Sequence, residues 1–291
     1  MSNEKFIITK ASGEEAYFSK EKLRTSLQRS GAGEDEIEHV IDEILPKLYP
    51  GIPTKKLYKM AFSLLKESSR HLAARYHLKH AIMELGPSGY PFEKYIAEIL
   101  KHQGYSTQTG IITQGQCVKH EVDIVANIGN HQLMIECKYH NQPGTFSDVK
   151  VPLYIQSRFK DIEAEWLKSG DRTKKYQGWV VTNTRFSMDA IQYGTCAGLR
   201  MLGWDYPVKK SLKVQIDESG LYPITCLTSL TKNEKQLLLG KKIVLCLELN
   251  EKILVGIGIK PQRLNTITME AHQLCKHLVK SKTNNHVSQT N

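Results

Sequence analysis

"HEVDIVANIGNHQLMIECKYH", residues 120–140, places charged side chains inside two apolar runs. Asp123 lies in the first run, while Glu136 and Lys138 lie at the end of the second. Side chains alternate between the two faces of a strand, so Glu136 and Lys138 share one face. The segment therefore predicts two neighbouring β-strands that otherwise have the composition of core segments.

The geometry of this hairpin suggests a chemical role for its charged residues. A turn at residues 129–130 places Asp123 directly opposite Glu136, close enough for both carboxylates to contact one ion. Adjacent carboxylates repel each other, and a divalent cation such as magnesium, which takes oxygen ligands and keeps several waters, relieves that repulsion. Lys138 would then position or deprotonate an attacking water and stabilise developing phosphate charge. Asp123, Glu136 and Lys138 are therefore the candidate catalytic residues.

Ordinary surface ion pairs are the simpler explanation of this spacing, because an acid followed by E-x-K is frequent in a chain of this length. Asp148 and Lys150 form a second acid-x-lysine match, which we discount because it stands beside Pro143 and Gly144 at the start of an expected helix. The carboxylates of the hairpin end apolar strands, between two helices and in a basic region. Their position favours a functional site over a chance pair.

The pattern around the hairpin predicts an α/β fold, a mixed sheet flanked by helices. The expected elements are a helix over 91–102, strands at 110–114, 121–128 and 132–139, a helix near 149–168, a strand over 177–182, a helix over 187–197 and a short strand near 199–204. The segment "LGPSGYP", Leu85 to Pro91, marks a linker or sharp turn before this region.

Residues 90–207 resemble the Mrr-like branch of the PD-(D/E)xK restriction endonucleases, through the runs FEKYIAEILKHQGY, HEVDIVANIGNHQLMIECKYH, GWVVTNTRFS and YGTCAGLRMLGWDYP. The resemblance implies a restriction-endonuclease-like sheet that binds Mg2+ for phosphodiester hydrolysis. It makes Asp123 and Glu136 metal ligands and Lys138 the catalytic lysine. Glu93, on the preceding helix, matches an auxiliary metal ligand, and an exposed helix acid is the alternative for it.

The N-terminal region predicts a β-hairpin followed by helices. The expected elements are a hairpin in "KFIITKASGEEAYFS" and helices over Lys20–Arg29, Asp35–Leu48, Thr54–Ser69 and His71–Leu85. Lys10, Lys20 and Lys22 lie near the hairpin and a helix start, where cations and free backbone N–H groups can receive phosphates. This charge pattern is compatible with a nucleotide ligand.

The runs FIITKASGEEAYFSKEKLRTSLQRSGA, GIPTKKLYKMAFSLL and AARYHLKHAI resemble the ATP-cone, a mostly helical nucleotide-sensing domain. The resemblance implies that Lys10 and Lys22 contact the phosphates of ATP or dATP and that Thr54 lies beside the nucleotide. The chain departs from the family at Ala11, where arginine is usual, and at Tyr58, where histidine is common. No Walker loop is present, so we expect sensing rather than hydrolysis. A small helical domain that mediates dimer contacts is the alternative.

The C-terminal region predicts a small helical module. "LVGIGIKPQRL", residues 254–264, resembles the turn of helix-hairpin-helix modules, which offers backbone N–H groups to a DNA phosphate. Lys260 and Arg263 would then contact DNA, and a helical cap on the nuclease core is the alternative. The expected domains are 1–88 for the ATP-cone, 89–210 for the nuclease, 222–280 for the helical module and 281–291 for a disordered tail.

Charge and composition set further bounds. The net charge is +10, and residues 91–291 carry 26 Lys and Arg against 18 Asp and Glu, whereas residues 1–90 carry 14 against 12. This excess predicts a polyanionic partner, with a merely basic surface as the alternative. Six scattered cysteines argue against a disulfide framework or zinc site, and neither a membrane span nor a secretory signal is apparent, so we expect a cytoplasmic protein.

The function that these features favour is a magnesium-dependent DNA endonuclease, restriction-like and regulated by ATP or dATP. The first alternative is a nucleotide-regulated DNA-binding protein without cleavage, in which the acids only hold Lys138. The second is a junction or repair nuclease on the same core. Cutting of both strands would require two metal sites, which a homodimer supplies.

Overall fold

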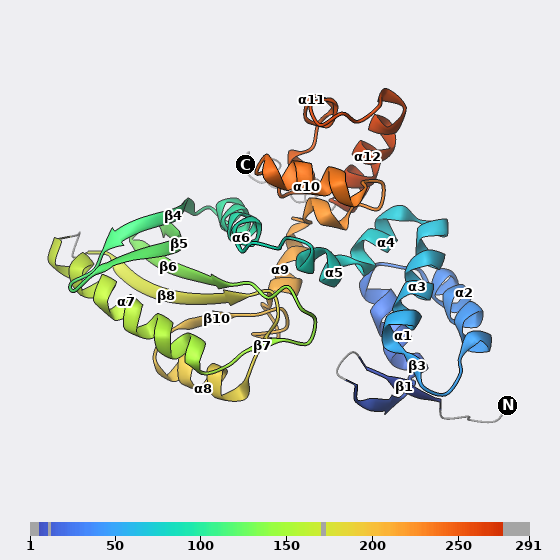
Figure 1. Cartoon of the computed structure of the whole chain (residues 1–291), viewed down its shortest axis with the longest axis horizontal. Coiled ribbons are helices and arrows are strands. Elements are labelled where there is room, and N and C mark those ends of the chain that lie inside the picture. The colour runs from blue at the N-terminus through green and yellow to red at the C-terminus, as the bar shows by residue number, and fades with distance from the viewer. Residues whose placement is uncertain (1–5, 11–12, 170–172, 276–291) are drawn as a thin grey trace, which may run out of the picture. The chain divides into compact units, whose positions relative to one another are not determined.

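The computed structural model describes residues 6–10, 13–169 and 173–275 and divides into two compact units (Figure 1). The central unit comprises Ile82–Pro223 and Leu239–Leu245. The terminal unit comprises the described residues up to Ala81, Ile224–Leu238 and those from Cys246 onward. Among the described residues, no helix combines the length and the apolar content that crossing a bilayer requires.

The central unit is built on a five-stranded sheet in the order β10-β8-β6-β5-β4. Its strands are β4 (Ser106–Gln114), β5 (Lys119–Ile128), β6 (His131–Lys138), β8 (Lys175–Thr182) and β10 (Arg200–Leu202). β4, β5 and β6 are antiparallel neighbours, and β6, β8 and β10 are parallel. The register pairs Ile128 with His131 and Ile124 with Ile135, so the predicted turn at residues 129–130 and the mixed sheet are both confirmed.

Helices α7 (Lys150–Ser169) and α8 (Met188–Cys196) cover one face of this sheet, and α6 (Tyr90–His102) packs against β4 and β5 (Figure 1). Every second residue of a strand faces the same side, and one side of the sheet meets the apolar stripe of α7. The core here comprises Val125, Met134, Val180, Met201, Ile155, Phe159 and Ile162. Glu136 lies two residues after Met134, so alternation puts it on the face that α7 covers.

A short parallel ribbon and helix α9 (Leu212–Ser219) complete the central unit. The ribbon pairs β7 (Phe146–Ser147) with β9 (Arg185–Phe186). It was not predicted, because two-residue strands carry no periodicity.

Tyr95 on α6 donates a 2.7 Å hydrogen bond to the carbonyl oxygen of Leu221, just beyond α9.

The terminal unit begins with a three-stranded sheet and a helical layer. The hairpin of β1 (Ile7–Thr9) and β2 (Glu15–Tyr17) was predicted, and β3 (Ile52–Pro53), which pairs in parallel with β1, was not. The helices are α1 (Lys20–Arg29), α2 (Glu34–Ile44), α3 (Thr54–Ser68) and α4 (Arg70–Tyr76). The single helix expected over 71–85 is divided at His77, and α5 (Leu78–Met83) spans the boundary of the units.

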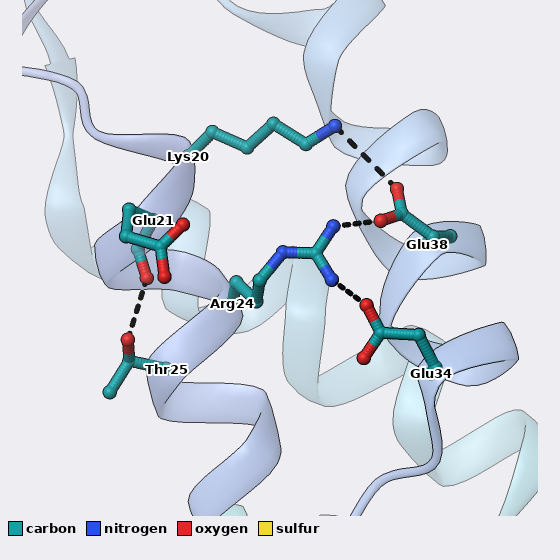
Figure 2. Close-up of polar contacts among 6 residues, drawn as sticks. All are labelled: Lys20, Glu21, Arg24, Thr25, Glu34 and Glu38. Carbon is teal, nitrogen blue, oxygen red and sulfur yellow. Dashed lines mark hydrogen bonds and ion pairs between the residues drawn. The ribbon is translucent and has the colours of Figure 1, made fainter.

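Ion pairs join α1 to α2 (Figure 2). The guanidinium of Arg24 contacts the carboxylates of both Glu34 and Glu38, and Lys20 lies 3.5 Å from Glu38. Beneath them, apolar residues at helical spacing form the core of the unit, among them Leu23, Leu27, Ile37, Val40, Ile41 and Ile44. The polar face therefore fixes the pairing of two helices that the core already brings together.

The C-terminal segment forms helices α10 (Lys232–Gly240), α11 (Glu251–Val255) and α12 (Pro261–Leu274). Arg75 on α4 contacts the carbonyl oxygen of Leu274 at 3.4 Å, and Thr225 donates to that of Ala81 at 2.7 Å. These contacts place most of this segment in the terminal unit, whereas the sequence suggests separate modules at 1–88 and 222–280. The tail expected at 281–291 lies outside the described residues.

Candidate active site

The two central strands separate where the acidic residues lie. Pairing between β5 and β6 ends at Ile124 and Ile135, whereas β6 stays paired with β8 from His131 through Lys138. Asp123 spans this gap, because its Oδ2 accepts a 2.7 Å hydrogen bond from the backbone N–H of Cys137. The sheet therefore brings Asp123 to the segment that carries Glu136 and Lys138.

Three carboxyl groups interact electrostatically at this point. Burial, and after it the charges of Asp123 and Glu121, raises the pKa of Glu93 on α6 to about 7. Burial followed by the charge of Asp123 also raises the pKa of Glu136 to about 7, with a smaller contribution from Glu93. The pKa of Asp123 is raised as well, chiefly by burial. Glu93, Asp123 and Glu136 therefore form an acid cluster that is short of positive charge.

Arg158 on α7 supplies one positive charge to the acid cluster. Its Nη1 lies 2.8 Å from Oε1 of Glu136, and its Nη2 donates to the carbonyl oxygen of Glu121. Its guanidinium also lies 5.5 Å from the centre of the Tyr154 ring. Arg158 was not predicted as a site residue. Its spacing of three residues from Ile155 and four from Ile162 indicates only that it lies beside the apolar stripe of α7.

The end of β6 is held by buried polar side chains. Lys138 itself is exposed, and its carbonyl oxygen accepts a 2.8 Å hydrogen bond from Oγ1 of Thr182. Asn183 is 1% exposed and forms two hydrogen bonds with the backbone of His140, accepting from N–H at 2.8 Å and donating to O at 2.7 Å. These contacts, which spacing in the sequence does not reveal, fix the backbone at the predicted catalytic lysine and two residues beyond it.

Tyr139, between Lys138 and His140, contacts the segment that leads into α6. Its hydroxyl donates a 2.6 Å hydrogen bond to the carbonyl oxygen of Met83, and its ring centre lies 5.7 Å from that of Phe92. Phe92 is buried and precedes Glu93 on α6. The strand end and the helix that carries the third acid are therefore packed together.

A cation could offset the excess negative charge of the acid cluster. Within the described ranges, no group of three or more His, Cys, Asp or Glu side chains is arranged to hold a metal ion. Magnesium, however, is commonly held by one or two carboxylates together with substrate phosphates. Oε2 of Glu136 is buried and has no hydrogen-bond partner among the residues that the structure describes. A cation would satisfy it and reduce the repulsion from Asp123. The residues present therefore fit a divalent cation.

The residues predicted to bind a nucleotide lie around β1 and α1. Thr9 pairs with Pro53 in parallel strands, so Lys10 and Thr54 follow at the same edge of the small sheet. The ammonium group of Lys10 forms a 2.9 Å ion pair with Glu14, and Lys22 lies in the first turn of α1. The arrangement brings Lys10 and Thr54 together at one edge.

The residues predicted to bind DNA differ in their availability. Lys260 is exposed and precedes α12. Arg263 is paired with the carboxylate of Glu234, and its Nη2 also donates to the carbonyl oxygen of Ser229 at 2.6 Å. The charge of Arg263 is therefore already matched within the terminal unit.

Two family models match the chain. Residues 86–203 match the Mrr catalytic domain, described as a restriction endonuclease, and residues 222–275 match a domain described as AF1548-like, C-terminal. The resemblance to a restriction endonuclease is thus confirmed, and the mixed sheet with its acid cluster lies within the matched residues. The match to the ATP-cone stays a prediction.

Known proteins resemble the chain over much of its length. An uncharacterized protein from Archaeoglobus fulgidus is 34% identical over 182 residues, which are 62% of this chain and 99% of that protein. The crystal structure of AF1548, a protein of unknown function, is 33% identical with a TM-score of 0.53 and covers 65% of this chain and 99% of that one. The MspJI restriction endonuclease in complex with a 27-mer oligonucleotide is 13% identical with a TM-score of 0.36, covering 60% of this chain and 36% of that one, which is too distant to support an argument.

Proposed function

Because the chain belongs to the AF1548-like family and its residues 86–203 form a restriction endonuclease domain, we propose that it is a divalent-cation-dependent DNA endonuclease. The observation that carries the proposal is the acid cluster at the separation of β5 and β6, with Lys138 on the same strand as Glu136. The net charge of +10 suits a polyanionic substrate.

Asp123 and Glu136 would hold the cation, with Glu93 as a third carboxylate. When bound, a divalent cation supplies Lewis-acid stabilisation of the charge that builds on the phosphate oxygens. Lys138, at an exposed strand end whose backbone is fixed by Thr182, would orient an attacking water and stabilise the same developing charge. The hydrogen bonds between Asn183 and His140 hold the backbone two residues beyond this lysine, whose charge acts on Asp123.

Cleavage of supercoiled plasmid DNA with Mg2+ tests the proposal. We expect nicked or linear products from the wild-type chain and none when the cation is chelated. Asp123→Asn should abolish the products while leaving the protein folded, and Asp205→Asn, at an exposed position in the same unit, should cleave like wild type. Cleavage that survives Asp123→Asn would refute the assignment of the site. The gel distinguishes nicks from double-strand breaks, and only the latter call for a homodimer.

DNA binding without cleavage is the second candidate. It is favoured by the ion pair between Arg158 and Glu136, which already neutralises one carboxylate of the cluster. This candidate predicts retardation of a DNA duplex in a gel, equal with and without Mg2+, and an unchanged plasmid after prolonged incubation. Mg2+-dependent products that Asp123→Asn abolishes would exclude it.

We also propose that the N-terminal part binds ATP or dATP and regulates the nuclease. Support comes from the shared edge of Lys10 and Thr54 and from Lys22 in the first turn of α1, where the positive end of the helix dipole favours phosphate. Titration of the full chain with ATP and dATP tests this. Lys10→Ala with Lys22→Ala should weaken binding at least tenfold, roughly the loss of one charge-assisted hydrogen bond, and Lys47→Ala, an exposed lysine on the same unit, should not. Equal affinities in all three proteins would remove the proposed phosphate contacts.

A further inference from the structure

Arg158 contacts both of the strands that separate at the acid cluster. Its guanidinium joins the carboxylate of Glu136, on β6, to the carbonyl oxygen of Glu121, on β5. The described pairing of β5 with β6 extends only to Ile124 and Ile135, so this contact holds the strands beyond the end of their hydrogen-bonded ladder. A planar guanidinium can donate to two acceptors in a fixed geometry, which a single ammonium group cannot match.

The contact with Arg158 involves only one of the two carboxylate oxygens of Glu136. Oε1 lies 2.8 Å from Arg158, whereas Oε2 is buried and no described residue forms a hydrogen bond with it. The Arg158 side chain is 12% exposed, so the pair is shielded from water and from screening by salt. One carboxylate oxygen is thus held in place, and the other stays available.

We infer that Arg158 is a positioning residue, which orients Glu136 so that Oε2 can bind the divalent cation. The inference rests on the proposed function, because it assumes that Glu136 is a cation ligand. The opposite relationship is competition, in which Arg158 occupies Glu136 and must leave before a cation binds. The two differ in sign: removing Arg158 weakens cation binding if it positions Glu136 and strengthens binding if it competes.

Binding of Mn2+ to the full chain, measured by calorimetry without DNA, distinguishes them independently of catalysis. We expect Arg158→Ala to weaken Mn2+ binding by about 10- to 100-fold, the usual effect of removing a partner that orients a metal ligand. Arg158→Lys keeps the charge but not the double contact, so its affinity should lie between those of wild type and Arg158→Ala. Lys160→Ala, two residues along α7 with a side chain that is 61% exposed, is the matched control and should bind like wild type.

Cleavage at increasing Mg2+ provides the second measurement. A positioning role raises the Mg2+ concentration for half-maximal rate in Arg158→Ala by a similar factor, while saturating Mg2+ restores most of the maximal rate. Suppose that the wild-type chain binds Mn2+ and cleaves DNA. Unchanged or tighter Mn2+ binding in Arg158→Ala would then overturn the positioning role of Arg158 and leave the proposed function standing. A wild-type chain that neither binds Mn2+ nor cleaves would overturn the proposed function itself. Arg158→Lys keeps the test decisive if Arg158→Ala does not fold.

Discussion

The carboxylate of Asp123 accepts a hydrogen bond from the backbone N–H of Cys137, at 2.7 Å, beyond the last residues at which β5 and β6 pair. A side chain here replaces a bond of the sheet ladder. Asp123 therefore has a structural task that can be separated from its proposed catalytic one.

Asp123→Ala and Asp123→Asn should separate these two tasks. Alanine leaves the N–H of Cys137 without its acceptor, which should lower the unfolding free energy by about 1–3 kcal/mol. Asparagine keeps a carbonyl oxygen for this N–H but removes the negative charge, so it should retain most of the stability and lose Mg2+-dependent cleavage. Urea unfolding and plasmid cleavage measure the two effects. Equal stability of both variants would show that the hydrogen bond contributes little.

Glu93→Gln should make the protein more stable in alkaline solution. Burial raises the pKa of Glu93 to about 7 from 4.5, so the folded state holds a proton that the unfolded state releases. Its stabilising contribution is complete below pH 4.5 and is lost as the pH rises through about 7. The glutamine side chain carries no charge, so the unfolding free energy at pH 8 should rise by about 1 kcal/mol, allowing for screening of a half-buried group.

Glu98 on the same helix serves as a control, because its pKa is lowered whereas that of Glu93 is raised. Burial would raise its pKa, but hydrogen bonds from Lys94 and Lys101 outweigh burial and lower it. Glu98→Gln should therefore destabilise the protein at pH 8, with an effect that fades as the pH falls below 4.5 and through the lowered pKa. Urea unfolding at pH 4, 6 and 8 measures both variants. A loss of stability in Glu93→Gln at pH 8 would contradict the proposed repulsion within the acid cluster.

Lys138→Ala should lower the rate of DNA cleavage by about 10²- to 10⁴-fold, the usual contribution of a positioned proton-transfer group. Lys150→Ala is the matched control, because Asp148 and Lys150 repeat the acid-x-lysine spacing outside the acid cluster. Asp148 has a local task there: its Oδ1 accepts a 3.0 Å hydrogen bond from the backbone N–H of Lys150 in the first turn of α7. Equal rates for the two variants would exclude a special role for Lys138.

Arg24→Ala should destabilise the terminal unit by about 1–2 kcal/mol, because its guanidinium serves two carboxylates, those of Glu34 and Glu38. Its side chain is 18% exposed, and Figure 2 shows it between the two helices. Lys47→Ala breaks only an exposed pair with Glu43 and should leave stability nearly unchanged. Chemical unfolding of the full chain measures both changes, and equal effects would indicate that Arg24 is a surface charge without a bridging role.

Lys260→Ala and Arg263→Ala should have different effects. Lys260→Ala would remove the predicted phosphate contact of an exposed lysine, which should weaken DNA binding and reduce its salt slope by about one. Arg263→Ala instead takes a donor from the carbonyl oxygen of Ser229 and from the carboxylate of Glu234, so it should lower stability by about 1–3 kcal/mol and leave the slope nearly unchanged. Fluorescence anisotropy at several salt concentrations and thermal unfolding give the two readings. A slope that Lys260→Ala leaves unaltered would remove the DNA contact.

Much of the central unit was predictable because its elements are long and periodic. The hairpin of β5 and β6 was correctly predicted, with its turn at residues 129–130, since the apolar runs alternate on both sides of a Gly-Asn pair. β3, β7 and β9 were missed because each has two residues, too few for any pattern. Local sequence also gave no sign that His77 divides the helix expected over 71–85.

From the sequence, candidate site residues could be proposed only within one motif, and not where tertiary packing adds them. Asp123 and Glu136 could be proposed together because a hairpin brings them together at short range in the sequence. Arg158 lies 22 positions after Glu136, and Asn183 reaches His140 from the bend that follows β8, so neither pairing can be read from spacing. Packing of α7 and of the end of β8 against β6 creates both contacts.

The hydrogen bond from Tyr139 to Met83 limits where a fragment that contains the restriction endonuclease domain can begin. Residues 85–91 have the composition of a linker, yet Met83, just before them, supplies an acceptor to the tyrosine that follows Lys138. Gly86 lies so close to that ring that an added Cβ would be 2.8 Å from it. A fragment that begins at residue 89 would leave this tyrosine without its acceptor and uncover its ring. An expression fragment that keeps the strand end intact has to begin at Ile82 or earlier.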